Sequence, residues 1–196
     1  MIDELPKPLL EGMGRKEVTE TLSRELAEKV LTVKGRYNYW AAEVWLDRYT
    51  DHESRVDFVS FEPLGGPTYT DGPHIERGRF SFYEVKSCVA DLKSGHGLTF
   101  EGDDNWLVMP VEMWEPYKQA VHEDEALYAK TRLASCLLYG SRRGKAGFFM
   151  VNEPFRADWL ARRRPASELL FCMMRASLAR SGQGPEVDAP RLAGVL

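Results

Sequence analysis

The feature that most constrains this chain is a strand-like segment with two opposite charges on one face. Residues 79–88 read RFSFYEVKSC, and the aromatic and β-branched residues that dominate them favour a strand. Side chains alternate along a strand, so Glu84 and Lys86 point to the same side. Burying such charges is costly unless they are paired or bind a metal. The segment therefore indicates an ion pair, a strand that surfaces at its end, or a hydrolytic metal site.

A second acid lies on the strand-like segment that precedes this one. Residues 55–63 read RVDFVSFEP and place Asp57 among apolar neighbours, and a connector rich in Gly, Pro, Asp and Thr follows at 64–78. Carboxylate oxygens are the ligands that Mg²⁺ prefers, and a nearby ammonium can stabilise developing negative charge. Glu-x-Lys alone is a weak signal, and an Asp on the preceding strand makes it more specific.

This order of features resembles the PD-(D/E)XK nuclease superfamily, and more narrowly a phage and bacterial branch allied to the MmcB-type DNA repair proteins. The similarity covers about residues 37–117. After the catalytic strand come a short helix with an Asp-Leu pair, a Gly-His segment and an Asn-aromatic strand ending in Val-x-Pro. These features are Asp91, Leu92, Gly95, His96, Asn105, Trp106 and Val108–Pro110. The sequence departs from the family where Arg55 and Val56 replace the expected proline, and in its short helix after Lys86.

The resemblance implies an α/β, restriction-endonuclease-like fold, in which helices flank a mixed central sheet and a C-terminal helical extension follows. It also implies that Asp57 and Glu84, with the backbone carbonyl of Val85, hold Mg²⁺ or Mn²⁺ while Lys86 assists phosphodiester hydrolysis. The expected substrate is DNA rather than RNA, in DNA repair or phage DNA processing, and a homodimer is compatible with the family. The alternative is a catalytically silent nuclease-like fold that binds DNA or a protein partner.

Four further residues are candidates for the site. Glu43 lies in the predicted first strand, residues 37–48, and is either a metal ligand or water-positioning base or an ordinary glutamate at a sheet edge. Glu25 lies beside the apolar stripe of the predicted helix 15–31, and the resemblance gives this helix a carboxylate at the metal site; the alternative is a solvated glutamate. Ser87 could orient a bound water and His96 could form a wall of the site, although each can also be structural.

The charge is unevenly distributed along the chain. Up to Ala129 there are 14 Lys and Arg against 25 Asp and Glu, and from Lys130 onward there are 12 against 5. A basic region of this kind suits contact with phosphates. The candidates are a turn between two predicted strands and a cluster before the last helix; a solvated hairpin tip is the alternative for the turn. The residues are Arg142, Arg143 and Lys145, and Arg162, Arg163 and Arg164.

The predicted organisation is a flexible arm at 1–14, an α/β core at 15–154, C-terminal helices packed on the core at 155–183 and a tail at 184–196. No apolar run approaches the roughly 20 residues that span a bilayer, and no signal peptide is recognisable. The three widely spaced cysteines suit reduced thiols. We therefore expect a cytoplasmic protein without a membrane partner. In the last helix, the expected packing face is Leu169, Leu170, Met173, Met174 and Leu178.

Overall fold

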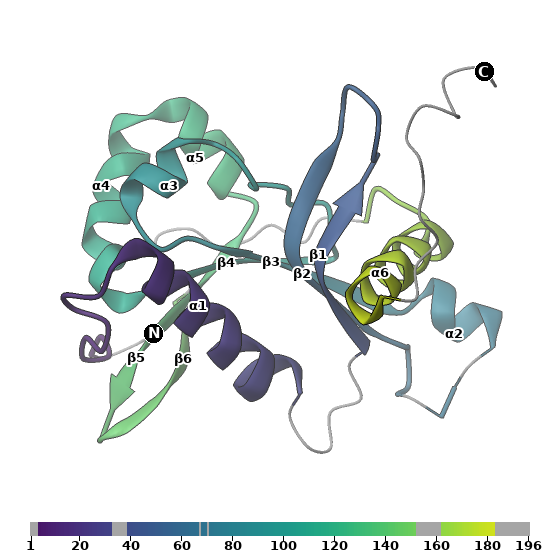
Figure 1. The fold of residues 1–196 in the computed structure, drawn as a ribbon, viewed down its shortest axis with the longest axis horizontal. Helices are drawn as coiled ribbons and strands as arrows, with labels where there is room; N and C mark the ends of the chain where they lie inside the picture. Colours follow the sequence, from purple (N-terminus) through teal and green to yellow (C-terminus); the bar gives the residue numbers. More distant parts are fainter. Residues whose placement is uncertain (1–3, 33–38, 67, 70, 152–161, 183–196) are drawn as a thin grey trace.

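A six-stranded sheet with helices on both faces organises the chain (Figure 1). The computed structural model describes residues 4–32, 39–66, 68–69, 71–151 and 162–182. The strands are β1 (Tyr39–Leu46), β2 (Ser54–Glu62), β3 (Arg79–Val85), β4 (Asp104–Pro110), β5 (Ser135–Arg142) and β6 (Lys145–Val151). The helices are α1 (Arg15–Leu26) with its π-helical continuation η1 (Ala27–Leu31), α2 (Gly72–Glu76), α3 (Val89–Lys93), the 3-10 turn η2 (Val111–Met113), α4 (Trp114–Glu123), α5 (Glu125–Thr131) and α6 (Ala166–Ser181).

The strands lie in the sheet in the order in which they occur in the chain. β1, β2 and β3 form an antiparallel meander, β3, β4 and β5 are mutually parallel, and β6 returns antiparallel to β5. The parallel neighbours are joined by crossovers that contain α3 in one case and α4 and α5 in the other. Parallel strands require such crossovers, whereas antiparallel strands can be joined directly by a hairpin; here β1–β2 and β5–β6 are short hairpins and the β2–β3 connector contains α2. The expected mixed sheet flanked by helices, with a helix at the C-terminal end, is confirmed.

The side-chain alternation of the central strands divides the core between the two faces. Tyr83 and Val85 of β3 pack with Leu22 of α1 on one face. Phe80 and Phe82 alternate with them and pack in a cluster that includes α6. β4 divides in the same way, with α4 and α5 covering the face opposite α1. Figure 1 shows these helices at one end of that face and α6 beside β1 at the other.

Residues 4–14 are attached to the core, which corrects the prediction of a flexible arm for this part of the chain. Lys7 forms an antiparallel bridge with Ser141 at the end of β5. The backbone N–H groups of Leu9 and Leu10 donate to one carboxylate oxygen of Glu112, at 3.0 and 2.7 Å. Leu10 is buried as well. The sequence of this segment lacks a helix or strand pattern, so only its partners in the folded chain reveal that it is held.

The helix α6 packs on β1, as expected for a C-terminal helix docked on the core. Leu169 and Met173 are buried, but Met174, predicted on the same face, is 51% exposed. Residues 155–161 and 183 of the predicted helical region, and the predicted tail, lie outside the described residues. Among the helices that the structure describes, none has the length and apolar character needed to cross a membrane.

Candidate functional site

Asp57 and Glu84 face each other where β2 and β3 separate. The last paired residues of this ladder are Phe58 and Tyr83, so Asp57 and Glu84 occupy the next pair of positions. The Asp57 carboxylate accepts a hydrogen bond from the Val85 N–H at 2.8 Å and so ends the ladder with a side chain. Because opposed residues of an antiparallel pair share a face, both carboxylates lie on the same side of the sheet. The structure thus brings together the two acids that the sequence singled out.

The Glu84 carboxylate is enclosed without a partner. Glu84 is 0% exposed, and no hydrogen bond of normal geometry from a described residue reaches either carboxylate oxygen. Burial raises the pKa of Glu84 well above its ordinary value, and the negative charge of Asp57 raises it further. Lys86 and the nearby Thr99 N–H, whose geometry is too poor for a normal hydrogen bond, oppose the shift. Burial also raises the pKa of the half-buried Asp57, although the Val85 N–H and Lys86 counteract it. This pair of acids would be stabilised by an added positive charge.

Lys86 is held beside these acids by the loop after α3. Its side chain is 5% exposed, and the ammonium donates to the carbonyl of His96 at 2.7 Å. The next residue, Gly97, has a φ of +62°, which favours glycine. A Cβ atom at Gly97 would lie 2.9 Å from Glu84 Oε2 and 3.5 Å from Lys86 Nζ. The loop therefore covers both charged groups closely at a position where only glycine fits.

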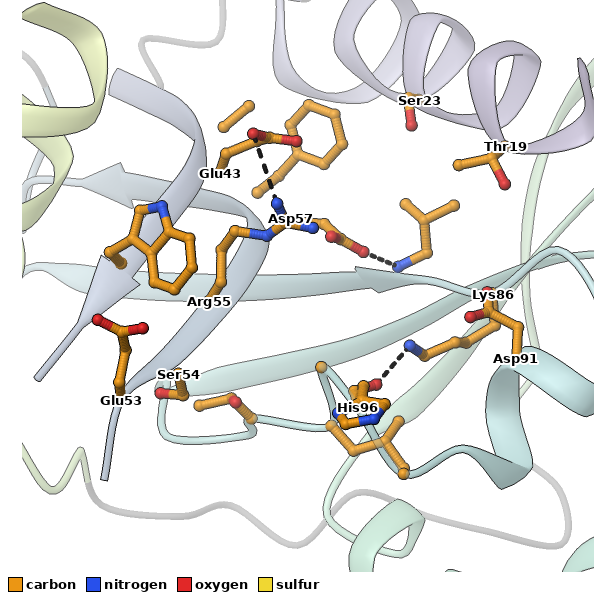
Figure 2. A pocket seen from close by; sticks show the side chains of 18 of the residues that line it. Thr19, Ser23, Glu43, Glu53, Ser54, Arg55, Asp57, Lys86, Asp91 and His96 are labelled. Atoms are coloured by element: carbon orange, nitrogen blue, oxygen red, sulfur yellow. Dashed lines mark hydrogen bonds and ion pairs between the residues drawn. The ribbon is translucent and has the colours of Figure 1, made fainter. Parts of the chain in front are cut away.

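A pocket of about 690 Å³ opens above this loop (Figure 2). Asp57, Lys86 and His96 line it, whereas Glu84 lies beneath its floor under Gly97. The opposite wall is α1, which contributes residues spaced one helical turn apart. Those residues are Arg15, Thr19 and Ser23, and Arg15 forms an ion pair with Asp91 of α3 at 2.8 Å. The pocket is thus a polar space between α1, the β1–β2 hairpin and the loop after α3.

Glu43 lines the same pocket from β1 in a strained conformation. It lies opposite Asp57, since the flanking pairs are Ala42 with Phe58 and Val44 with Val56. Its φ of +54° is left-handed, which costs a residue with a side chain about 1–2 kcal/mol. Ala42 and Val44 consequently belong to different core clusters, so β1 changes faces at Glu43. Strain of this kind in a residue other than glycine is concentrated at functional sites.

Glu43 forms an ion pair with the neighbouring Arg55. Arg55 lies 3.7 Å from the Glu43 carboxylate, and both side chains are about half exposed. Arg55 also lowers the pKa of Asp57 and of Glu84, although burial is the larger influence on both. Figure 2 shows Glu43, Arg55 and Asp57 side by side on the wall of the pocket. Three acids thus lie in a row across β1, β2 and β3, with two cationic side chains beside them.

Glu25 is not part of this site, which corrects its prediction as a metal ligand. Its carboxylate accepts a hydrogen bond from the Tyr139 hydroxyl at 2.8 Å and pairs with Lys29 at 2.6 Å. Burial raises the pKa of Glu25, but the hydrogen bonds from Lys29 and Tyr139 outweigh it and leave the pKa lowered. Glu25 does lie on the sheet side of α1, as its position beside the apolar stripe predicts. It lies over β5, however, rather than over β2 and β3.

Of the two remaining polar candidates, one reaches the pocket. The exposed His96 lines it, although the contact with Lys86 comes from the His96 carbonyl rather than from the ring. Ser87 is buried outside the pocket, and its hydroxyl has no hydrogen-bond partner among the described residues. The site-wall role stays open for His96. A water-orienting role for Ser87 would need access that the structure does not provide.

The basic turn between β5 and β6 lies at the far edge of the sheet from β1 and β2. Arg142 donates a short hydrogen bond to the carbonyl of Glu4 and stacks on Phe149, while Arg143 and Lys145 are exposed. None of the three lines the pocket. A phosphate contact at this turn would therefore be remote from the acids, and its prediction stays untested.

The arginines before α6 hold the fold together, which corrects the prediction of phosphate contacts for two of them. The guanidinium of Arg162 donates to the carbonyls of Gly78 and Glu76, at 2.9 and 2.6 Å. Arg164 pairs with three carboxylates, and its side chain is 15% exposed. Those carboxylates belong to Asp47, Glu101 and Glu168. Arg163 alone of this cluster is exposed.

Sequence reasoning missed Arg55 and the polar residues of α1. Arg55 precedes Asp57 by two positions, and strand alternation could have placed it on the same face. Thr19 and Ser23 are four residues apart beside the apolar stripe of α1, and this spacing is a signal for one helix face. The family resemblance implies a carboxylate from this helix, and Glu25 is the acid beside its apolar stripe. Which of these flanking residues faces the site depends on how α1 crosses the sheet.

The donor set for a metal is small. Within the described residues, no group of three or more His, Cys, Asp or Glu side chains is close enough to hold a metal ion. The unpartnered Glu84 oxygens beside Asp57 nevertheless fit a cation, provided that backbone carbonyls or waters complete the ligand set, as Mg²⁺ commonly allows. Comparisons with protein-family models, with curated proteins and with solved structures gave no match, so the geometry of this site carries the functional assignment.

Proposed function

We propose that this protein is a nuclease that depends on Mg²⁺ or Mn²⁺ and hydrolyses phosphodiester bonds in DNA. The observation that supports it best is the Asp57–Glu84 pair, in which an enclosed carboxylate without a partner lies beside a second acid and near Lys86. The PD-(D/E)XK resemblance rests on these three residues. A restriction-endonuclease-like fold for the mixed sheet is part of the same proposal.

In this proposal each residue has a separate role. Asp57, Glu84 and the backbone carbonyl of Val85 would hold the metal, which would supply water activation and stabilisation of charge on the scissile phosphate. Lys86 uses the protons not donated to His96 to stabilise the negative charge that develops on the phosphate. Glu43, opposite Asp57, orients the attacking water. Because both Glu84 oxygens are enclosed, the loop that carries Gly97 must withdraw when the site is loaded.

The test combines cleavage and metal binding. Single-stranded, duplex and branched DNA are incubated with wild-type protein, Asp57→Asn, Glu84→Gln and Lys86→Met in Mg²⁺ or Mn²⁺, and metal binding is measured by calorimetry. We expect Lys86→Met to lower the cleavage rate by about 10²–10³-fold, the usual effect of removing one charge-stabilising donor. The matched control is Lys7→Met, an exposed lysine beside the end of β5, remote from the acids. Cleavage that persists in Lys86→Met or in excess EDTA would overturn the proposal.

Metal binding tests the ligands independently of turnover. Asp57→Asn and Glu84→Gln should each weaken Mn²⁺ binding, because each removes a charged ligand, whereas Lys86→Met should leave it intact or stronger. Unchanged affinity in Asp57→Asn would remove this residue from the ligand set. These variants therefore separate a failure of the ligand assignment from a failure of the catalytic assignment.

The small number of side chains that could bind a metal favours a second function, binding without catalysis. Two carboxylates without a third side-chain ligand, one of them enclosed, would suit a nuclease-like fold that binds DNA or a protein without cutting. DNA binding with no metal-dependent turnover on any of the three DNA structures would support this alternative.

A further inference from the structure

A second hollow, of about 760 Å³, lies between α6 and the β1–β2 hairpin. Its residues on the hairpin side include Trp45, Arg48 and Tyr49, and those on the α6 side include Phe171 and Arg175. It shares lining residues with the pocket over Asp57, so the two hollows adjoin. The shared residues are Ala42, Glu43, Trp45 and Arg180. The second hollow is called here the α6 groove, and it lies along α6 next to the pocket that contains Asp57.

Aromatic rings and guanidinium groups are paired in the α6 groove. Arg48 lies over the rings of Trp45 and Tyr49, at 5.5 and 5.0 Å from their centroids. Arg175 lies over Phe171 at 5.9 Å. Phe171 is 53% exposed and Tyr49 is 45% exposed. Cations also lie over rings elsewhere in the described chain, as Arg142 does over Phe149, so the feature of this hollow is that exposed rings and guanidinium groups are gathered together in it.

Packing of the core does not account for this gathering of exposed rings. α6 buries Leu169 and Met173 against β1 and turns Phe171 and Met174 away from the core. Both of these exposed residues line the α6 groove. Their apolar surface is thus gathered on one side of α6, next to the site, rather than scattered over the molecule. Such a gathered surface beside polar residues marks an interaction site.

The charge of the α6 groove identifies the chemistry of the partner. Among the described residues, no carboxylate lies within ion-pair distance of Arg48, Arg175 or Arg180, whereas Arg164 at the start of the same helix is matched by three. The uncompensated arginines favour a polyanion over a neutral peptide. Rings that accept stacked bases, together with cations that follow a backbone, are the features by which proteins bind single-stranded nucleic acid.

We propose that the α6 groove holds a single strand of DNA and guides it to the acids. Its bases stack on Tyr49 and Phe171, and its phosphates contact Arg48, Arg175 and Arg180. A duplex hides the faces of its bases, so it cannot use these rings. The inference rests on the proposed nuclease function for its choice of DNA, and it adds that the strand entering the site is unpaired.

Binding is measured by the fluorescence anisotropy of labelled oligo-dT in EDTA, so that no cleavage occurs. Phe171→Ala should weaken binding by about 5- to 150-fold, the usual effect of losing one stacked base. Arg175→Ala should make the dependence of affinity on salt shallower by about 0.7, as expected for one lost contact with a single-stranded phosphate. Both substitutions lie in a helix, where alanine is favourable, and circular dichroism checks their folding.

Matched controls use residues of the same kinds elsewhere. Tyr69→Ala removes a ring that is 48% exposed in the connector between β2 and β3, and Lys7→Ala removes an exposed cation beside the end of β5, away from the α6 groove. Both should bind oligo-dT as the wild type does. Wild-type affinity in Phe171→Ala and Arg175→Ala would overturn the inference. Tighter binding of duplex DNA, of oligo-U or of a peptide than of oligo-dT would also overturn it.

The experiment separates this inference from the proposed function. It is run without metal, so it remains informative if the protein proves unable to cut DNA. Unchanged Mn²⁺ affinity in both Asp57→Asn and Glu84→Gln would contradict the proposed metal site. The effect of Phe171→Ala on oligo-dT binding would still test the α6 groove. Conversely, if metal-dependent cleavage is intact but Phe171→Ala and Arg175→Ala bind oligo-dT as the wild type does, only the inference about the α6 groove is contradicted.

Discussion

Replacing Glu84 with glutamine isolates the electrostatic feature on which the site depends. Burial, followed by the charge of Asp57, raises the pKa of Glu84 well above its ordinary value of 4.5. The folded protein therefore keeps this proton at pH values where the unfolded chain has lost it. Between the ordinary pKa and the raised one, the folded state binds more protons, so its free energy of unfolding falls as pH rises.

Glutamine has nearly the same shape as glutamate and does not titrate. In Glu84→Gln the free energy of unfolding should therefore not show this fall with rising pH. Relative to wild type, its free energy of unfolding should rise by up to about 1.4 kcal/mol for each pH unit within the interval. In a chain of this size, about 1 kcal/mol corresponds to roughly 2–4 °C in Tm. The measurement is urea unfolding in EDTA at several values between about pH 5 and pH 8, with the difference from wild type plotted against pH.

The control is Glu62→Gln, at an exposed glutamate on the end of β2 away from the site. Because this side chain is exposed, its substitution should change the free energy of unfolding by less than about 0.5 kcal/mol. Adding Mn²⁺ should stabilise the wild type by about 2.7 kcal/mol at a hundredfold excess over Kd, and Glu84→Gln by less. A difference between Glu84→Gln and wild type that stays constant over the whole pH range would refute the reasoning, because Glu84 would then titrate alike in both states.

Two further predictions concern the loop and the arginine network. Gly97→Ala should destabilise the protein by about 2–3 kcal/mol, because a left-handed φ costs about 1–2 kcal/mol and the new Cβ would lie 2.9 Å from a Glu84 oxygen. Gly144→Ala, with a φ of +75° and open space around it, should show only the conformational cost, and equal losses in urea unfolding would contradict the close contact. Arg164→Ala should lower stability by about 2 kcal/mol, since it leaves three partly buried carboxylates without their partner. Arg163→Ala, at an exposed position, should change stability by less than about 0.5 kcal/mol, and a similar loss in both variants would argue against the network.

The strands near the site were predictable because their signals are local. The residue pattern predicted a strand within 55–63, and the structure has it at Ser54–Glu62. The strand predicted over 79–88 ends at Val85, because the ladder with β2 stops at the Asp57 side chain and the chain turns into α3. Gly182 ends the last helix with a φ of +69°, a conformation that glycine adopts readily.

The site residues that the sequence mispredicted or missed are those whose surroundings depend on how the helices and strands pack. Helix periodicity identifies the sheet side of α1 but not which strand lies beneath each turn. The predicted Glu25 therefore lies over β5, whereas Thr19 and Ser23 reach the pocket. Arg164 lies in a basic run of the kind that binds phosphates. In the folded protein it instead forms ion pairs with Asp47 and Glu101, which are far from it in sequence. A basic residue in a sequence does not reveal whether acids have already neutralised it.

The sequence by itself determined which side chains could form the site. Strand alternation places Glu84 and Lys86 on one face, and an acid on the preceding strand follows from a pattern only a few residues long. The tertiary structure alone decided that Gly97 encloses Glu84, that Glu43 adopts a left-handed conformation opposite Asp57, and that α6 lies along β1 to form a groove. These features arise from packing between segments distant in the chain, where many contacts jointly fix positions that no local pattern encodes.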